Sequence, residues 1–238
     1  MFVVKKRNII ISFVLVITLL TFFLCFGAIV KNNSDNVLAT GYKIVIDAGH
    51  GGIDAGVTGT VSKVKESDLN LAVSKKLEKY VKDAGFMAVL TRKTEAGLYG
   101  LATSNLKKKD MLKRKEIINS EKPTLVISIH MNKFSVSSRR GAQVFYKEGD
   151  EKGTLLAKSI QNAFNNMEES PRQSSALKGD YYILNCSSYP SVIAECGFLS
   201  NPEDEALLIT EEYQDKVAYT IFKGIIEYFS QASFKFCY

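Results

Sequence analysis

The chain alternates between short apolar runs and longer segments in which apolar residues recur at helical spacing. The short runs are rich in β-branched residues and predict strands at 43–47, 86–91, 124–130, 142–146, 181–184 and 191–195. The longer segments predict helices at 67–84, 108–120, 153–166 and 211–229, with a further helix that begins at Asn201-Pro202. Strands that alternate with amphipathic helices are typical of an α/β domain, so we expect a single α/β sandwich built on a largely parallel sheet.

One apolar segment, 9–30, departs from this alternation, because only one serine and two threonines interrupt it. Its length is about the 20 residues that a helix needs to cross a bilayer core. Basic residues at 5–7 precede it, which keeps the N-terminus in the cytoplasm and sends the rest across. We expect a cytoplasmic basic N-terminus at 1–8 and a transmembrane anchor at 9–30. The alternative is a cleavable signal segment, cut near 37–39, and either form exports the domain.

Composition sets the remaining boundaries. Residues 31–42 are polar and aperiodic and predict a linker, 43–232 carry the α/β pattern, and 233–238 form a tail. Of the formal net charge of +6, the cluster at 5–7 supplies three, which leaves about +3 on the exported part. That mild excess suits an anionic surface such as a cell wall, and it gives no case for nucleic-acid binding.

The cysteines do not predict a disulfide framework. Three of the four lie beyond the apolar segment, and an odd number cannot all pair within one chain. A bond between Cys186 and Cys196 is the pairing that the spacing leaves open, although we do not expect it.

The chain has only two histidines, and each follows a buried strand. His50 lies in a glycine-rich turn after the strand at 43–47, and His130 ends the run at 124–130. Because side chains at the carboxyl ends of neighbouring parallel strands share one edge of the sheet, we expect a common site. Histidine and carboxylate ligands around an open position are what a catalytic zinc needs. A histidine taken singly is more often a structural residue, and that alternative stands for each.

Two carboxylates are candidates for the same site. Glu66 abuts the N-terminus of the helix at 67–84, a rigid mount for a third ligand, although it could equally be a charge that interacts with the helix dipole. Glu195 follows an apolar strand, so we expect burial to raise its pKa toward that of a general base. The alternative for Glu195 is a structural carboxylate paired to an arginine such as Arg92. Glu78 and Glu95 look like ordinary surface residues.

Four motifs occur in order and carry a family resemblance. They are Asp47-Ala48-Gly49-His50-Gly51-Gly52, then Glu66 ahead of Asp68-Leu69-Asn70-Leu71, then Ser128-Ile129-His130-Met131-Asn132, and Glu195-Cys196-Gly197-Phe198-Leu199-Ser200-Asn201-Pro202. With them the chain resembles the zinc-dependent N-acetylmuramoyl-L-alanine amidases of the Amidase_3 family. Two positions depart from the family pattern: Met131 stands where alanine is usual, and Cys196 stands where threonine is usual.

The resemblance implies a fold and an active site. The fold would be a three-layer domain with a mixed, mostly parallel sheet of about six strands and helices on both faces. His50, Glu66 and His130 would bind Zn²⁺, and Glu195 would be the catalytic carboxylate. For substrate binding the candidates are Asn132 and Arg92. The substrate would be peptidoglycan, cut between N-acetylmuramic acid and L-alanine.

The layout is similar to that of the sporulation amidases of the CwlD type. That similarity implies work in the spore cortex, where removal of stem peptides prepares muramic-δ-lactam, and a sporulation lipoprotein as activating partner. A vegetative amidase for cell separation or wall turnover is the nearer alternative. Two alternatives belong to other functional classes. One is a non-catalytic protein that binds the cell wall, and the other is a zinc carboxypeptidase or deacetylase that acts on the same polymer.

Overall fold

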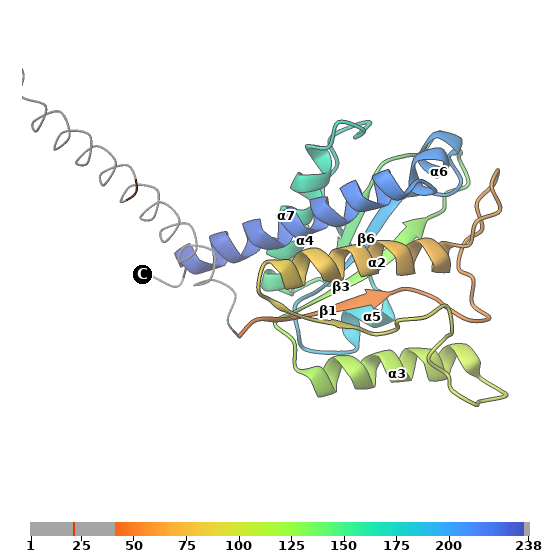
Figure 1. Ribbon diagram of the computed structural model, residues 1–238, viewed down its shortest axis with the longest axis horizontal. Coiled ribbons are helices and arrows are strands. Elements are labelled where there is room, and N and C mark those ends of the chain that lie inside the picture. The colour runs from red at the N-terminus through yellow and green to blue at the C-terminus, as the bar shows by residue number, and fades with distance from the viewer. Residues whose placement is uncertain (1–20, 22–40, 236–238) are drawn as a thin grey trace, which may run out of the picture. The chain divides into compact units, whose positions relative to one another are not determined.

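The computed structural model describes Thr21 and residues 41–235. Its elements are β1 (Lys43–Ala48), α2 (Glu66–Asp83), β2 (Met87–Leu90), α3 (Leu106–Glu121), β3 (Leu125–Asn132), β4 (Gln143–Tyr146), α4 (Glu151–Asn165), β5 (Leu177–Lys178), α5 (Tyr182–Asn185), β6 (Ser191–Phe198), α6 (Pro202–Leu208) and α7 (Glu211–Lys235) (Figure 1). The apolar segment predicted at 9–30 lies outside the described residues apart from Thr21. Within the part described, no helix is long and apolar enough to cross a membrane.

A six-stranded sheet in the order β2-β1-β3-β6-β4-β5 forms the centre of the domain. The strands β2, β1, β3 and β6 run parallel to their neighbours, whereas β4 pairs with β6 in the antiparallel sense. β5 then pairs with β4 in parallel. The expected mixed, mostly parallel sheet is therefore confirmed.

Helices cover both faces of this sheet (Figure 1). On one face, Val45, Val126 and Ile193 of three neighbouring strands pack against Ile118 of α3 and Ile183 of α5. On the other face lies α2, and α7 packs against both α2 and α4. The three-layer arrangement places the carboxyl ends of β1 and β3 at one edge, where the chain's two histidines lie.

Helix α2 forms as its apolar stripe predicts. Leu69, Val73, Leu77 and Val81 recur at helical spacing and all are buried. The helix ends at a Schellman motif, in which Gly85 N–H donates to Lys82 O and Phe86 N–H donates to Val81 O. Gly85 takes the left-handed conformation that this motif requires, with φ of 84°. The predicted end of the helix was thus one residue late, at 84.

One predicted strand is wrong. Residues 181–184 form no strand, because Tyr182–Asn185 is the short helix α5, and the remaining strand of the sheet is β5 at Leu177–Lys178. Four apolar residues are too few for periodicity to distinguish a strand from a helical turn. Local bonds decide for the helix: Leu184 N–H and Asn185 N–H both donate to Tyr181 O.

Strands β3 and β6 run further than their apolar patterns predicted, to Asn132 and Phe198. The register between them shifts after the pair His130 and Glu195, so that Asn132 next pairs with Phe198. This irregularity gives β6 one more residue than β3 over the same length, which is the signature of a bulge. Bulges of this kind are common beside active sites, because they re-aim side chains.

Neither buried cysteine of the sheet region forms a disulfide. Cys186 and Cys196 are both free, as expected. Cys196 is 1% exposed on β6, next to the partly exposed Glu195. Alternation along a strand places these two neighbours on opposite faces.

The start of α6 is built as the sequence predicted, and it anchors a distant loop. Asn201 caps the helix by accepting from Glu203 N and Asp204 N, and Pro202 is its first residue. In the same helix Glu205, 1% exposed, accepts hydrogen bonds from Thr60, Val61 and Ser62. Burial alone would raise the pKa of Glu205, but hydrogen bonds from Ser62 and Val61 outweigh it and lower the pKa to about 2.

Glu205→Gln is therefore expected to destabilise the protein at neutral pH and not in acid. The native pKa lies below the ordinary 4.5, so the stabilisation is present above that value and is lost as the pH falls toward 2. The shift corresponds to roughly 3 kcal/mol of unfolding free energy. Urea unfolding at several pH values measures the difference between variant and parent. Glu212→Gln, at a side chain that is 82% exposed, is the control. A difference that stays constant from pH 7 to pH 3 contradicts the prediction.

Candidate metal and catalytic site

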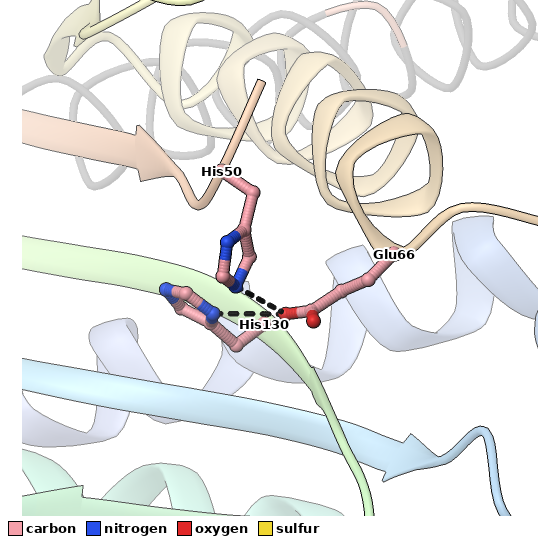
Figure 2. A group of neighbouring side chains, drawn as sticks. All are labelled: His50, Glu66 and His130. Atoms are coloured by element: carbon pink, nitrogen blue, oxygen red, sulfur yellow. Dashed lines mark hydrogen bonds and ion pairs between the residues drawn. The ribbon is translucent and has the colours of Figure 1, made fainter. Parts of the chain in front are cut away.

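The turn after β1 has an unusual backbone. His50 has φ of 60°, in the left-handed region, and Gly51 and Gly52 follow with φ of 132° and 62°. A non-glycine residue in that region is uncommon and persists only where surrounding contacts hold it. Here the turn directs the imidazole of His50 toward the carboxyl edge of the sheet (Figure 2).

Two buried arginines donate hydrogen bonds to the backbone carbonyl groups of this turn. Arg92 donates to the carbonyl oxygens of Ala48 and Gly49, each at 2.9 Å. Arg114 donates to the carbonyl oxygen of His50 at 2.6 Å and pairs with Asp47 and Asp110, each also at 2.6 Å. These hydrogen bonds satisfy the carbonyl groups where β1 ends, and they fix the course of the turn.

Arg92, a candidate for substrate binding, is 3% exposed in the structure. Its guanidinium also donates to the carbonyl oxygens of Thr94 and Ser67, in addition to those of the turn. All the hydrogen bonds of Arg92 that the structure shows therefore go to backbone.

His50, Glu66 and His130 converge from three elements (Figure 2). One ligand-type atom of each lies within 4.8 Å of the others. Nε2 of His50 lies 3.3 Å from Oε1 of Glu66, and Nδ1 of His130 lies 2.9 Å from the same oxygen. The two imidazole rings meet edge to face, with their centroids 5.0 Å apart. The sequence predicted this grouping from strand ends and a helix start, and the structure brings all three together.

Glu66 is a buried carboxylate, and it is 2% exposed. Besides the two imidazoles, its oxygens accept from Met131 N at 3.1 Å and from Val57 N at 2.8 Å. Burial alone would raise the pKa of Glu66, but the hydrogen bonds to His130 and His50 outweigh it and hold the pKa well below its usual range. The group stays ionised at neutral pH, and its oxygens point into the domain, away from bulk solvent.

The donor set fits a metal ion. Two imidazole nitrogens and one carboxylate oxygen, with room for a fourth ligand, are the protein ligands of catalytic zinc sites. All three side chains line one cavity of about 390 Å³, which leaves space for a substrate group at the open position. Within the described part of the chain this group could therefore hold a metal.

Glu195 faces the same cavity. It is the register partner of His130 across β3 and β6. Its Oε2 is buried and has no hydrogen-bond partner among the described residues, and Arg92 bonds elsewhere. Burial raises the pKa of Glu195 to about 7. A carboxyl with that pKa and an unpaired oxygen is suited to exchange protons near neutral pH.

Asn132, which the sequence offered as a candidate for substrate binding, lines the cavity. Several other side chains in the cavity were not predicted from the sequence. Asp54, Lys107, Lys133, Tyr181 and Tyr182 also line this cavity. Asp54 had a visible signal, because it follows His50 by four residues within the same turn. The others come from segments whose approach depends on the fold.

Gly49→Ala is expected to disrupt the site although its backbone conformation is ordinary. A Cβ at Gly49 would lie 2.3 Å from both Cε1 and Nε2 of His130, so the imidazole would have to move. We expect the affinity of this group for a metal ion to fall by more than about tenfold. Gly100→Ala is the control for backbone strain away from the imidazole, because Gly100 has φ of 58° and no other atom lies within 4 Å of the new Cβ. An unchanged metal affinity in Gly49→Ala would show that the ring is not held by this contact.

Comparison with known proteins gives one consistent result. Residues 44–227 match the family model Amidase_3, described as N-acetylmuramoyl-L-alanine amidase. The chain is 36% identical over 196 residues to the germination-specific N-acetylmuramoyl-L-alanine amidase of Bacillus subtilis, covering 81% of each protein.

Solved structures agree. The CwlD amidase from Clostridioides difficile, solved in complex with the GerS lipoprotein, superposes with a TM-score of 0.76 at 36% identity. That match covers 79% of this chain and 98% of the other. An N-acetylmuramoyl-L-alanine amidase from Clostridium difficile 630 superposes with a TM-score of 0.70 at 29% identity, covering 79% of this chain and 97% of the other.

Proposed function

The chain belongs to the N-acetylmuramoyl-L-alanine amidase family Amidase_3, and from this premise we propose that it is a zinc-dependent cell-wall amidase. It would hydrolyse the amide between N-acetylmuramic acid and L-alanine of the peptidoglycan stem peptide. The observation that carries the proposal is the convergence of His50, Glu66 and His130 beside the unpaired carboxyl of Glu195.

The mechanism assigns roles to these residues. His50, Glu66 and His130 would hold the metal. Zinc, when bound, supplies a Lewis acid that polarises the scissile carbonyl and lowers the pKa of water. Glu195 takes a proton from the attacking water as its oxygen adds to the carbonyl carbon. Glu195 then delivers that proton to the nitrogen of L-alanine as the carbon–nitrogen bond breaks. The products are a lactyl carboxylate and a stem peptide with a free amino terminus.

A digest of purified peptidoglycan tests the activity. Mass spectrometry should find stem peptides that begin with a free L-alanine, and a chelator should suppress their release. Loss of a terminal D-alanine or of acetate would instead identify a carboxypeptidase or a deacetylase. Binding without any product would support the non-catalytic alternative.

We further propose that this amidase acts in the spore cortex. This role is supported by the 36% identity to the germination-specific amidase of B. subtilis and by the structural match to CwlD. In this role the amidase removes stem peptides so that muramic-δ-lactam can form in the spore cortex. Muropeptide analysis of spores from a deletion strain decides the matter. An unchanged δ-lactam content would contradict the cortex role and favour vegetative wall turnover.

We also propose that the enzyme acts outside the cytoplasmic membrane, where peptidoglycan lies, anchored or secreted through residues 9–30. The CwlD structure was solved with a lipoprotein, and this supports a lipoprotein activator for the present chain. Co-expression with candidate sporulation lipoproteins, followed by affinity purification and the same digest, tests for an activating partner. A digest that no co-purified lipoprotein accelerates would count against one.

A further inference from the structure

Asp54 makes a contact on the side of His50 that faces away from Glu66. Its Oδ2 lies 3.0 Å from Nδ1 of His50, while Nε2 of the same ring lies 3.3 Å from Glu66. The carboxylate itself is held in place, because its Oδ1 accepts from Gly56 N at 3.1 Å. The backbone of Asp54 also exchanges two hydrogen bonds with that of Gly51, which closes the turn.

We propose that Asp54 is a positioning residue, which fixes the imidazole of His50 so that Nδ1 carries the proton and Nε2 is offered to the metal. The proposal deepens the function proposed above and rests on it. An ionised carboxylate can only accept hydrogen bonds, and each ring nitrogen of His50 lies beside one. A metal ion held by Glu66 and His130 would take the place of a proton on Nε2, which leaves the ring proton on Nδ1, against Asp54. A neutral ring then has its free lone pair on Nε2, which points into the ligand cluster.

The two histidines are thereby held by different means. His130 turns Nδ1 toward Glu66, the opposite nitrogen to that used by His50. Its ring lies against the Cα of Gly49, with no space for a side chain between them. Both rings pack closely against a glycine, His130 against Gly49 and His50 against Gly56, but His50 also has a carboxylate beside the nitrogen that faces away from Glu66. Outer carboxylates of this kind fix the tautomer of metal-binding histidines in general.

The segment from Asp54 to Val57 supports this arrangement as a unit. A Cβ at Gly56 would lie 2.4 Å from Oε2 of Glu66 and 2.7 Å from Cδ2 of His50. The next residue, Val57, donates its N–H to that same oxygen of Glu66. The turn therefore wraps closely around two of the three proposed ligands, and Asp54 is its charged contact with the imidazole.

Because the chain has only two histidines, their tautomers can be observed directly. Proton–nitrogen correlation spectra of the zinc-loaded protein, with its histidines isotope-labelled, should show one ring protonated at Nδ1, which ring-to-backbone correlations assign to His50. The other ring, that of His130, should be protonated at Nε2. A spectrum in which His50 is protonated at Nε2 overturns the proposal, whatever any Asp54 variant does.

Asp54→Asn provides the second test. The single side-chain oxygen of asparagine would accept from Gly56 N–H, so its NH₂ group would face Nδ1 of His50. A donor at that position favours the tautomer protonated at Nε2. We expect zinc affinity, measured by chelator competition, to fall 10- to 100-fold, with a changed absorption spectrum of the cobalt-loaded protein. A merely structural role would instead lower the urea midpoint of the metal-free protein and leave these readouts unmoved. Asp83→Asn, an exposed carboxylate paired with Lys79, is the control.

The outcomes separate the two proposals. If the parent protein binds no zinc, the proposed function fails. If the parent binds zinc and cleaves peptidoglycan while Asp54→Asn retains parental affinity and cobalt spectrum, only the role of Asp54 fails. Should Asp54→Asn not fold, Asp54→Glu keeps the carboxylate, and the spectrum of the parent still decides.

Discussion

Glu195→Gln will leave zinc bound and lower the turnover of peptidoglycan by roughly 10²- to 10⁴-fold, the range that general acid–base catalysis contributes. Glutamine has the shape of glutamate but cannot take up a proton. Glu195 is not among the three residues whose ligand atoms converge, so the metal site should remain intact. Product release by mass spectrometry and zinc content by elemental analysis measure the two effects on one sample.

The location of Glu195 makes this variant well suited to the test. Its Oε2 has no partner among the described residues, so the substitution breaks no internal ion pair. A neutral side chain in this partly buried position should be easier to accommodate than a carboxylate. Parental turnover in Glu195→Gln would remove this residue from the mechanism, whereas loss of zinc would place it in the metal site.

Glu66→Gln has the second large effect expected, the loss of the metal itself. Both oxygens of Glu66 accept hydrogen bonds, from Val57 N on one side and from Met131 N and the imidazoles on the other. An amide NH₂ in either position would face a donor, which leaves buried groups unpaired at about 1–3 kcal/mol each. We expect zinc affinity to fall by more than about 100-fold and activity to fall with it.

Glu78→Gln is the matched control for Glu66→Gln. Glu78 lies on the same helix, α2, and its carboxylate pairs with Lys82 one turn further on. It is not one of the residues that line the cavity. Zinc titration and urea unfolding of both variants separate loss of the ligand from a general weakening of α2. Parental zinc affinity in Glu66→Gln would refute its assignment as a ligand.

Most of the fold could be predicted because its elements follow from local periodicity. Each of these signals comes from residues that are near neighbours in the chain. Examples are the apolar stripe of α2, the cap at Asn201 and the apolar runs of β1 and β3. The prediction failed at 181–184, where four apolar residues carried no period and backbone hydrogen bonds from α5 to Tyr181 decided. The far ends of β3 and β6 were missed because their pairing beyond His130 depends on a bulge.

The sequence by itself determined the types and strand-end positions of the two histidines, and the helix start that carries Glu66. These features depend on neighbours in the chain. Only the tertiary structure decided which nitrogen of each imidazole faces Glu66. It also decided that Arg92 and Arg114 donate to the carbonyl groups of the turn after β1, and that one oxygen of Glu195 has no partner among the described residues. Each of these depends on distances of a few ångströms between segments far apart in sequence, which hydrophobic patterning does not encode.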